Sequence, residues 1–115
     1  MFGLFKKKVS LEKVNQFCEW FYQNNERIIQ SVSQAGKDNS LMMYVLDEVE
    51  NALSKVYRDG YKGSIEFEYG FNSNTQKWDL FLYHMNNKYL IEATHMIATA
   101  LEAKMKDIWS IHISE

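Results

Sequence analysis

Residues 77–85 form a predicted β-strand with large apolar side chains on both of its faces. Successive side chains of a strand point to opposite faces of the sheet, so a half-buried strand should alternate apolar and polar residues. One parity of this segment carries Trp78, Leu80 and Leu82. The other parity carries Phe81, Tyr83 and Met85. Both faces therefore need cover, either from the chain's own helices or from a partner.

Two amphipathic helices are predicted before this strand. The first begins after the N-cap residue Ser10, follows helical spacing, and ends near Gly36. The second runs from Leu41 to about Tyr57 and is followed by Gly60. Asn25 interrupts the apolar stripe of the first helix; we expect a hydrogen-bonded structural amide there, with a bend in the helix or a ligand contact as alternatives.

After Gly63 the apolar period changes to two. Residues 64–71 form a predicted one-sided strand, with Glu66 and Glu68 on its polar face, and residues 72–76 form a hairpin loop. A third helix is predicted over residues 88–106 after the capping pair Asn86 and Asn87, and a last strand over residues 108–114.

The predicted fold is therefore α+β, in the order α-α-β-β-α-β, with a three-stranded, mostly antiparallel sheet packed by helices. Residues 10–115 form one domain, and residues 1–9 are expected to be a flexible basic tail. The last strand can lie beside the second strand, or beyond the first as in a split β-α-β unit. We favour the split arrangement, with strand order 2-1-3.

The charge distribution argues against a nucleic-acid-binding protein. The formal net charge is −2, and Lys6, Lys7 and Lys8 supply three of the thirteen basic residues, which leaves the rest of the chain acidic. Aromatic strands could stack RNA bases, but the basic patch that such binding needs is missing. No apolar run approaches the ~18–20 residues of a membrane span, and the start of the chain lacks the order of a signal peptide. We expect a cytoplasmic protein without stable membrane association.

The sequence contains none of the common catalytic or metal-binding motifs. A glycine-rich phosphate loop, CxxC, HExxH and GxSxG are all missing, and His84, His95 and His112 lack the spacing of metal ligands. The single cysteine, Cys18, falls among aromatic residues at helical spacing, which is typical of a buried structural thiol. We therefore predict no catalytic, cofactor or metal site.

Three segments resemble a loose group of small, uncharacterised bacterial α+β proteins. They are residues 17–26 (FCEWFYQNNE), residues 65–68 (IEFE) and residues 109–113 (WSIHI). Members of this group open with a helix carrying a Trp-Phe-x-x-Asn-Glu-like segment and end in a strand introduced by Trp; some resemble immunity proteins of polymorphic toxin systems. This chain has one extra residue before the Glu and lacks a proline before the final strand. The resemblance carries over no catalytic residue and implies a non-enzymatic role.

Our leading hypothesis is a non-enzymatic protein-interaction domain, such as an inhibitor or immunity protein, with a protein partner or as a homodimer. Glu66 and Glu68 could form an acid/base pair, but their alternation with core residues favours a solvated strand face. Its acidic charge could steer a basic partner protein or could simply confer solubility. The predicted partner-binding residues are Phe81, Tyr83, Met85, Glu66 and Glu68. The alternatives are a small-ligand-binding domain or enzyme with a pocket between sheet and helices, near Asn25, His84 and Tyr83, or a second face that is simply core between helix layers.

Overall fold

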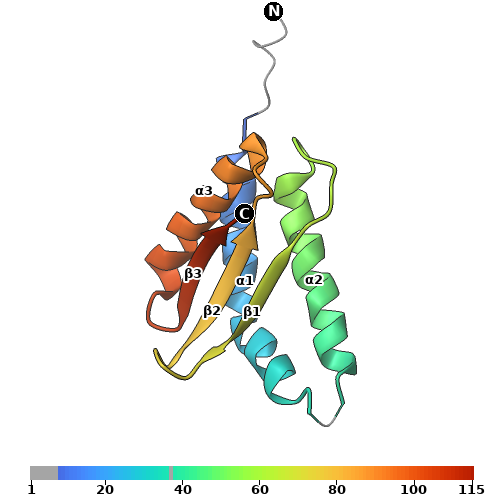
Figure 1. The fold of residues 1–115 in the computed structure, drawn as a ribbon, viewed down its shortest axis with the longest axis vertical. Coiled ribbons are helices and arrows are strands. Elements are labelled where there is room, and N and C mark those ends of the chain that lie inside the picture. The colour runs from blue at the N-terminus through green and yellow to red at the C-terminus, as the bar shows by residue number, and fades with distance from the viewer. Residues whose placement is uncertain (1–7, 37) are drawn as a thin grey trace, which may run out of the picture.

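A computed structural model describes residues 8–36 and 38–115 of the chain. Three helices and three strands follow one another in the predicted order, which confirms the α+β class (Figure 1). The elements are α1 (Leu11–Ser33), α2 (Ser40–Tyr57), β1 (Phe67–Asn72), β2 (Lys77–Tyr83), α3 (Lys88–Met105) and β3 (Trp109–Ser114).

Polar side chains cap two of the helices where the sequence predicts them. The Ser10 hydroxyl accepts a hydrogen bond from the Lys13 backbone N–H at 3.2 Å, at the start of α1. The Asn87 side chain accepts one from the Leu90 N–H at 3.0 Å, at the start of α3. Each bond satisfies one of the backbone donors that the first turn of a helix leaves without a partner. The helix α1 is a single assigned element through Asn25.

The strand order is β1-β2-β3, so the predicted order 2-1-3 is wrong. β1 pairs with β2 antiparallel, and β2 pairs with β3 parallel after the crossover through α3. The order 2-1-3 would have placed the one-sided strand β1 at the centre and left β2 at an edge. In the structure the most apolar strand is central, where Leu80 and Leu82 are fully buried.

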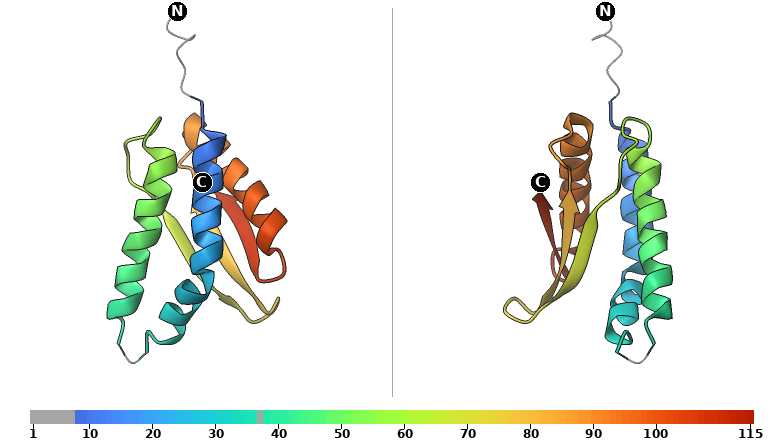
Figure 2. Two further views of the ribbon diagram at one scale, coloured as in Figure 1. Left: turned by 180° about the vertical axis from the view of Figure 1, so that it is seen from behind. Right: turned by 45° about the vertical axis from the view of Figure 1, so that its right-hand side comes forward.

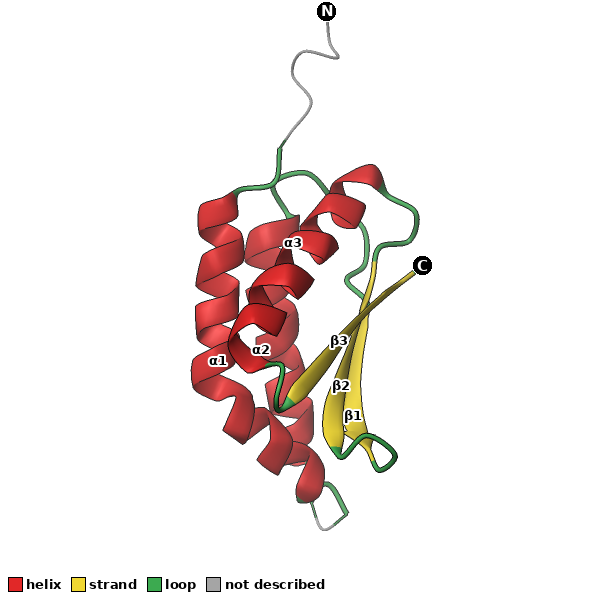
Figure 3. Cartoon of the chain, turned by 90° about the vertical axis from the view of Figure 1, so that its left-hand side faces the viewer, coloured by secondary structure: helices red, strands yellow, loops and turns green. Residues whose placement is uncertain are grey.

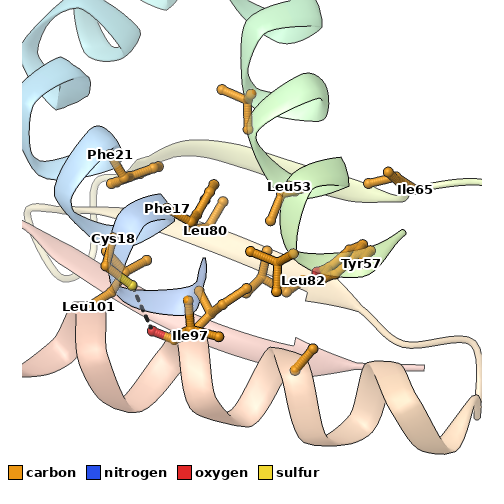
Figure 4. Packing of buried hydrophobic residues seen from close by; sticks show 14 of the residues in the cluster. Phe17, Cys18, Phe21, Leu53, Tyr57, Ile65, Leu80, Leu82, Ile97 and Leu101 are labelled. Atoms are coloured by element: carbon orange, nitrogen blue, oxygen red, sulfur yellow. Dashed lines mark hydrogen bonds between the residues drawn. The ribbon is translucent and has the colours of Figure 1, made fainter. Parts of the chain in front are cut away.

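All three helices lie on one face of the sheet, and the opposite face carries no helix among the described residues (Figure 3). Seen from behind, α1 lies between α2 and α3 (Figure 2), and it packs against both. The core fills the space between helices and sheet. Its fully buried members include Phe21 from α1, Leu53 from α2, Leu80 and Leu82 from β2, and Ile97 and Leu101 from α3 (Figure 4).

Met85 does not continue the strand that the sequence pattern predicts. β2 ends at Tyr83, and Met85 and Asn86 both have positive φ angles, of 47° and 59°. This left-handed backbone ends the alternation of side chains and turns the chain toward α3. The Met85 side chain consequently packs against the core cluster and does not share a face with Phe81.

Residues 1–7 of the predicted tail lie outside the described residues, but its last residue belongs to the folded domain. Val9 is buried in the core, and its backbone N–H donates a 3.1 Å hydrogen bond to the Glu92 carboxylate on α3. The folded domain therefore includes Val9, which the sequence-based boundary assigned to the tail. Over residues 8–36 and 38–115, no helix combines the length and apolar character needed to cross a bilayer.

Candidate functional site

The face of the sheet opposite the helices is the candidate functional site, and we call it the open face. The register places its residues in rows that cross the strands. Its members are Glu68, Gly70 and Asn72 from β1, Lys77, Asp79, Phe81 and Tyr83 from β2, and Ser110, His112 and Ser114 from β3. Glu66 extends it just before β1, because its carbonyl accepts a 3.3 Å hydrogen bond from the Tyr83 N–H and continues the ladder.

The central row of the open face joins a carboxylate and two rings. Phe81 lies opposite Glu68 on one side and His112 on the other. The rings of Phe81 and His112 stack with their centroids 4.6 Å apart and their planes 19° from parallel. Neither ring reaches the core, so this stack is a surface feature held in place by strand pairing.

The neighbouring row contains a hydrogen-bonded carboxylate. Asp79 Oδ1 accepts from His112 Nε2 at 2.9 Å, and Asp79 Oδ2 accepts from Asn72 Nδ2 at 3.0 Å. The hydrogen bond from His112 lowers the pKa of Asp79, and the Asn72 hydrogen bond acts in the same direction. Asp79 is therefore ionised at neutral pH, and it orients the imidazole that stacks on Phe81.

At the last residue of β2, Tyr83 lies across the sheet from the backbone of Glu66 and diagonal to Glu68. Partial desolvation raises the pKa of the Tyr83 hydroxyl, and the charge and hydrogen bond of Glu68 raise it further. Tyr83 is thus a neutral hydrogen-bonding ring at physiological pH, beside an acidic group.

A hollow of about 230 Å³ opens on this face above Gly70. It is lined by Glu68, Tyr69, Gly70, Phe71, Asp79 and Phe81. A Cβ atom added to Gly70 would meet no other heavy atom within 4 Å, so the missing side chain leaves open space. The glycine thereby leaves the flanks of Asp79 and Phe81 open to solvent.

The structure brings together four of the five residues that the sequence predicts for partner binding. Glu66, Glu68, Phe81 and Tyr83 share the open face, while Met85 packs against the core. The prediction missed Asp79, His112 and Asn72. Parity alone places Asp79 on the face of Phe81, but only the pairing of β2 with β3 brings His112 to it.

The alternative pocket between sheet and helices is not formed by the residues predicted for it. Tyr83 lies on the open face, Asn25 is buried in the helix layer, and His84 Nδ1 accepts the Asn86 N–H at 3.0 Å. The Asn25 amide donates to the Tyr22 carbonyl at 2.8 Å, but its oxygen is buried without a partner among the described residues. The expectation of a fully satisfied amide is therefore only half met.

Cys18 and His95 do not belong to a catalytic or metal-binding arrangement in the part of the chain that the structure describes. Burial raises the pKa of the Cys18 thiol to about 11, against a smaller opposing effect of Lys104, so the thiolate is scarce at neutral pH. His95 donates to the Ile91 carbonyl at 2.7 Å within its own helix. Within residues 8–36 and 38–115, no three His, Cys, Asp or Glu side chains gather where they could hold a metal ion.

A second hollow, of about 290 Å³, lies between α1 and α2. Phe17, Trp20 and Ala52 contribute apolar walls, and Lys13 at its rim is bound to Asp59 at 2.7 Å. The mixture of opposite charges along this groove defines no single ligand class.

No protein-family model, curated protein or solved structure matches this chain, so function is inferred from the site alone.

Proposed function

We propose that the chain is a non-enzymatic protein-interaction domain that binds a partner protein through the open face, as an inhibitor or immunity protein would. The observation that carries this proposal is the Phe81–His112 stack, two rings held on a sheet face that the described helices leave uncovered. Aromatic side chains on a fixed backbone supply contact area at low entropic cost, and such residues dominate interface energetics.

The charge of the open face favours a basic partner over a second copy of this chain. Glu66, Glu68 and Asp79 are acidic, the imidazole of His112 is already bound to Asp79, and the ammonium of Lys77 donates to the Lys106 carbonyl. A face-to-face dimer would bring acidic residues against acidic residues, which disfavours association. A partner with basic groups meets no such repulsion and is steered toward the face.

A comparison of two double variants tests the proposal. Phe81→Ser with Tyr83→Ser removes the rings of the open face, whereas Met43→Ser with Tyr44→Ser removes two exposed apolar side chains from α2, on the helix side. Each protein is immobilised, exposed to lysate of the source cells, and its retained proteins are quantified by mass spectrometry after circular dichroism has confirmed folding.

We expect a protein that the wild type and the α2 variant retain equally and that the open-face variant retains at least about tenfold less, the effect of losing about 1.4 kcal/mol of binding. Retention that is unchanged in the open-face variant, or lost only in the α2 variant, contradicts the proposal. Light scattering of the isolated protein should give the mass of a monomer; a dimer that dissociates in the open-face variant would instead make the second copy the partner.

A further inference from the structure

The hollow above Gly70 has the shape and chemistry of a socket for one basic side chain. Building on the binding role proposed for the open face, we infer that it receives an arginine of the partner protein. The inference rests on three features: open space above a glycine, two carboxylates at the rim, and an aromatic ring at the side.

The space exists because β1 carries a glycine opposite Asp79. In a strand, each residue facing outward normally covers part of its cross-strand neighbour. Gly70 has no side chain to cover that neighbour, whose side chain is 14% exposed, and nothing else fills the position within 4 Å of where a Cβ would lie. A planar side-chain end can therefore descend to the backbone of β1 between Glu68 and Asp79.

The rim supplies acceptors that suit a guanidinium group. Asp79 accepts one hydrogen bond on each oxygen, from His112 and from Asn72, and a carboxylate has about four acceptor sites, so each oxygen can accept another. Glu68 lies diagonal to Asp79 on the neighbouring strand and is exposed. Two carboxylates on either side of one hollow match the five donors that a guanidinium presents in a plane.

The ring of Phe81 adds a preference for arginine. It lies directly opposite Glu68 and lines the hollow. A guanidinium can lie against an aromatic face while donating at its edge to a carboxylate, which an ammonium does less well. Lys77 on the same strand donates to the Lys106 carbonyl at 2.8 Å, so its ammonium group is engaged at the end of α3.

The test uses Nα-acetyl-arginine amide as the probe and nuclear magnetic resonance of the full-length, ¹⁵N-labelled chain as the readout. We expect saturable chemical-shift changes that are centred on the amide signals of Gly70, Asp79 and Phe81. The dissociation constant should lie in the millimolar range. The matched neutral probe is Nα-acetyl-citrulline amide, which has nearly the same shape without the charge. It should bind at least about tenfold more weakly, as expected when charge-assisted hydrogen bonds are lost.

Two variants locate the site. Gly70→Val fills the hollow with a residue that strands favour, and Glu68→Gln removes one charge; each should weaken the arginine probe by about tenfold or more. Gly36→Ala, at another glycine with open space around it, and Glu102→Gln on α3 are the matched controls and should leave binding unchanged. Equal binding of citrulline or of the corresponding lysine probe, shifts centred elsewhere, or full binding by folded Gly70→Val would each overturn the inference.

The outcomes separate this inference from the proposed function. If the captured partner is lost from the Phe81→Ser, Tyr83→Ser variant but retained in full by Gly70→Val, the open face binds a partner and the arginine socket is wrong. If the arginine probe binds at Gly70 but the Phe81→Ser, Tyr83→Ser variant retains the partner in full, the socket exists and the proposed function is wrong.

Discussion

The side chains on the two faces of β2 are in two different physical situations. On the helix side, Leu80 and Leu82 have no exposed surface and contribute to a single core. On the open face, Asp79 and Phe81 each keep some exposed surface, and each has a specific neighbour in the side chain of His112. Apolar residues at both parities of a strand therefore have two causes here: burial on one side, and an organised surface on the other.

The contrast predicts unequal costs for truncating neighbouring side chains. Fully burying a leucine side chain is worth about 1.5–3 kcal/mol, and removing it also leaves a cavity. Leu82→Ala should therefore lower the free energy of unfolding by about 3 kcal/mol. Phe81→Ala removes a larger side chain from the next position but opens no internal cavity, so its cost should be about 1 kcal/mol or less.

Urea denaturation followed by circular dichroism measures both values, with equal m-values as the check that both variants unfold in the same two-state manner. Leu80→Ala is the second core variant and should match Leu82→Ala, because both side chains are fully buried. A Phe81→Ala protein as unstable as Leu82→Ala would mean that the open face is part of the folding core, and the distinction between the faces would fail.

Sequence periodicity predicts the elements well because each helix and strand is a local pattern. The caps Ser10 and Asn87 are also local, since each bonds a backbone group three residues away. Strand order depends instead on which strands pair across the sheet. Leu80 and Leu82 mark β2 as the most buried strand, and giving more weight to that signal would have placed it at the centre.

The open-face cluster was only partly predictable for a related reason. Alternation assigns Phe81 and Tyr83 to one face, but the contact of His112 with Asp79 spans 33 positions in sequence and depends on the parallel register. The position of Met85 depends on a left-handed backbone at residues 85 and 86, which no apolar period reveals. The features that sequence periodicity did not predict are therefore determined by strand pairing and by backbone turns, more than by residue type.

A tyrosine on the helix side gives the next largest effect. The Tyr57 hydroxyl is buried and has no hydrogen-bond partner among the described residues, and burial raises its pKa well above the usual value. Removing an unsatisfied buried hydroxyl relieves a desolvation cost, so Tyr57→Phe should keep or raise the free energy of unfolding at pH 7, by up to about 1 kcal/mol.

The same variant changes the alkaline limit of stability. A tyrosine whose folded pKa is raised stabilises the fold below its unfolded pKa of about 10, and this contribution is lost as pH rises toward the folded value. Tyr57→Phe should therefore unfold less readily than the wild type above about pH 10, as measured by urea midpoints from pH 7 to 11. Tyr44→Phe, at an exposed ring on α2, is the control. A loss of more than about 1.5 kcal/mol at pH 7 in Tyr57→Phe would indicate that the hydroxyl is hydrogen-bonded after all.

The smallest effect concerns the carboxylate of the open face. Hydrogen bonds from His112 and Asn72 lower the pKa of Asp79, so the folded state binds this proton less tightly than the unfolded state. The resulting stabilisation is present above the unfolded pKa of about 4 and is lost as pH falls through the folded pKa. Asp79→Asn should remove it, at a cost below about 1 kcal/mol at pH 7, because the His112 side chain is 44% exposed and water partly screens the pair.

Urea midpoints from pH 7 down to pH 2 give the measurement, with Asp107→Asn, an exposed acid just before β3, as the matched control. The difference between wild type and Asp79→Asn should shrink on acidification and vanish once the wild-type carboxyl is protonated. A difference that persists at pH 2 would come from side-chain packing and would place Asp79 with the helix-side residues. A difference that vanishes would mean that the ionised Asp79 carboxylate stabilises the open face through its hydrogen bonds with His112 and Asn72.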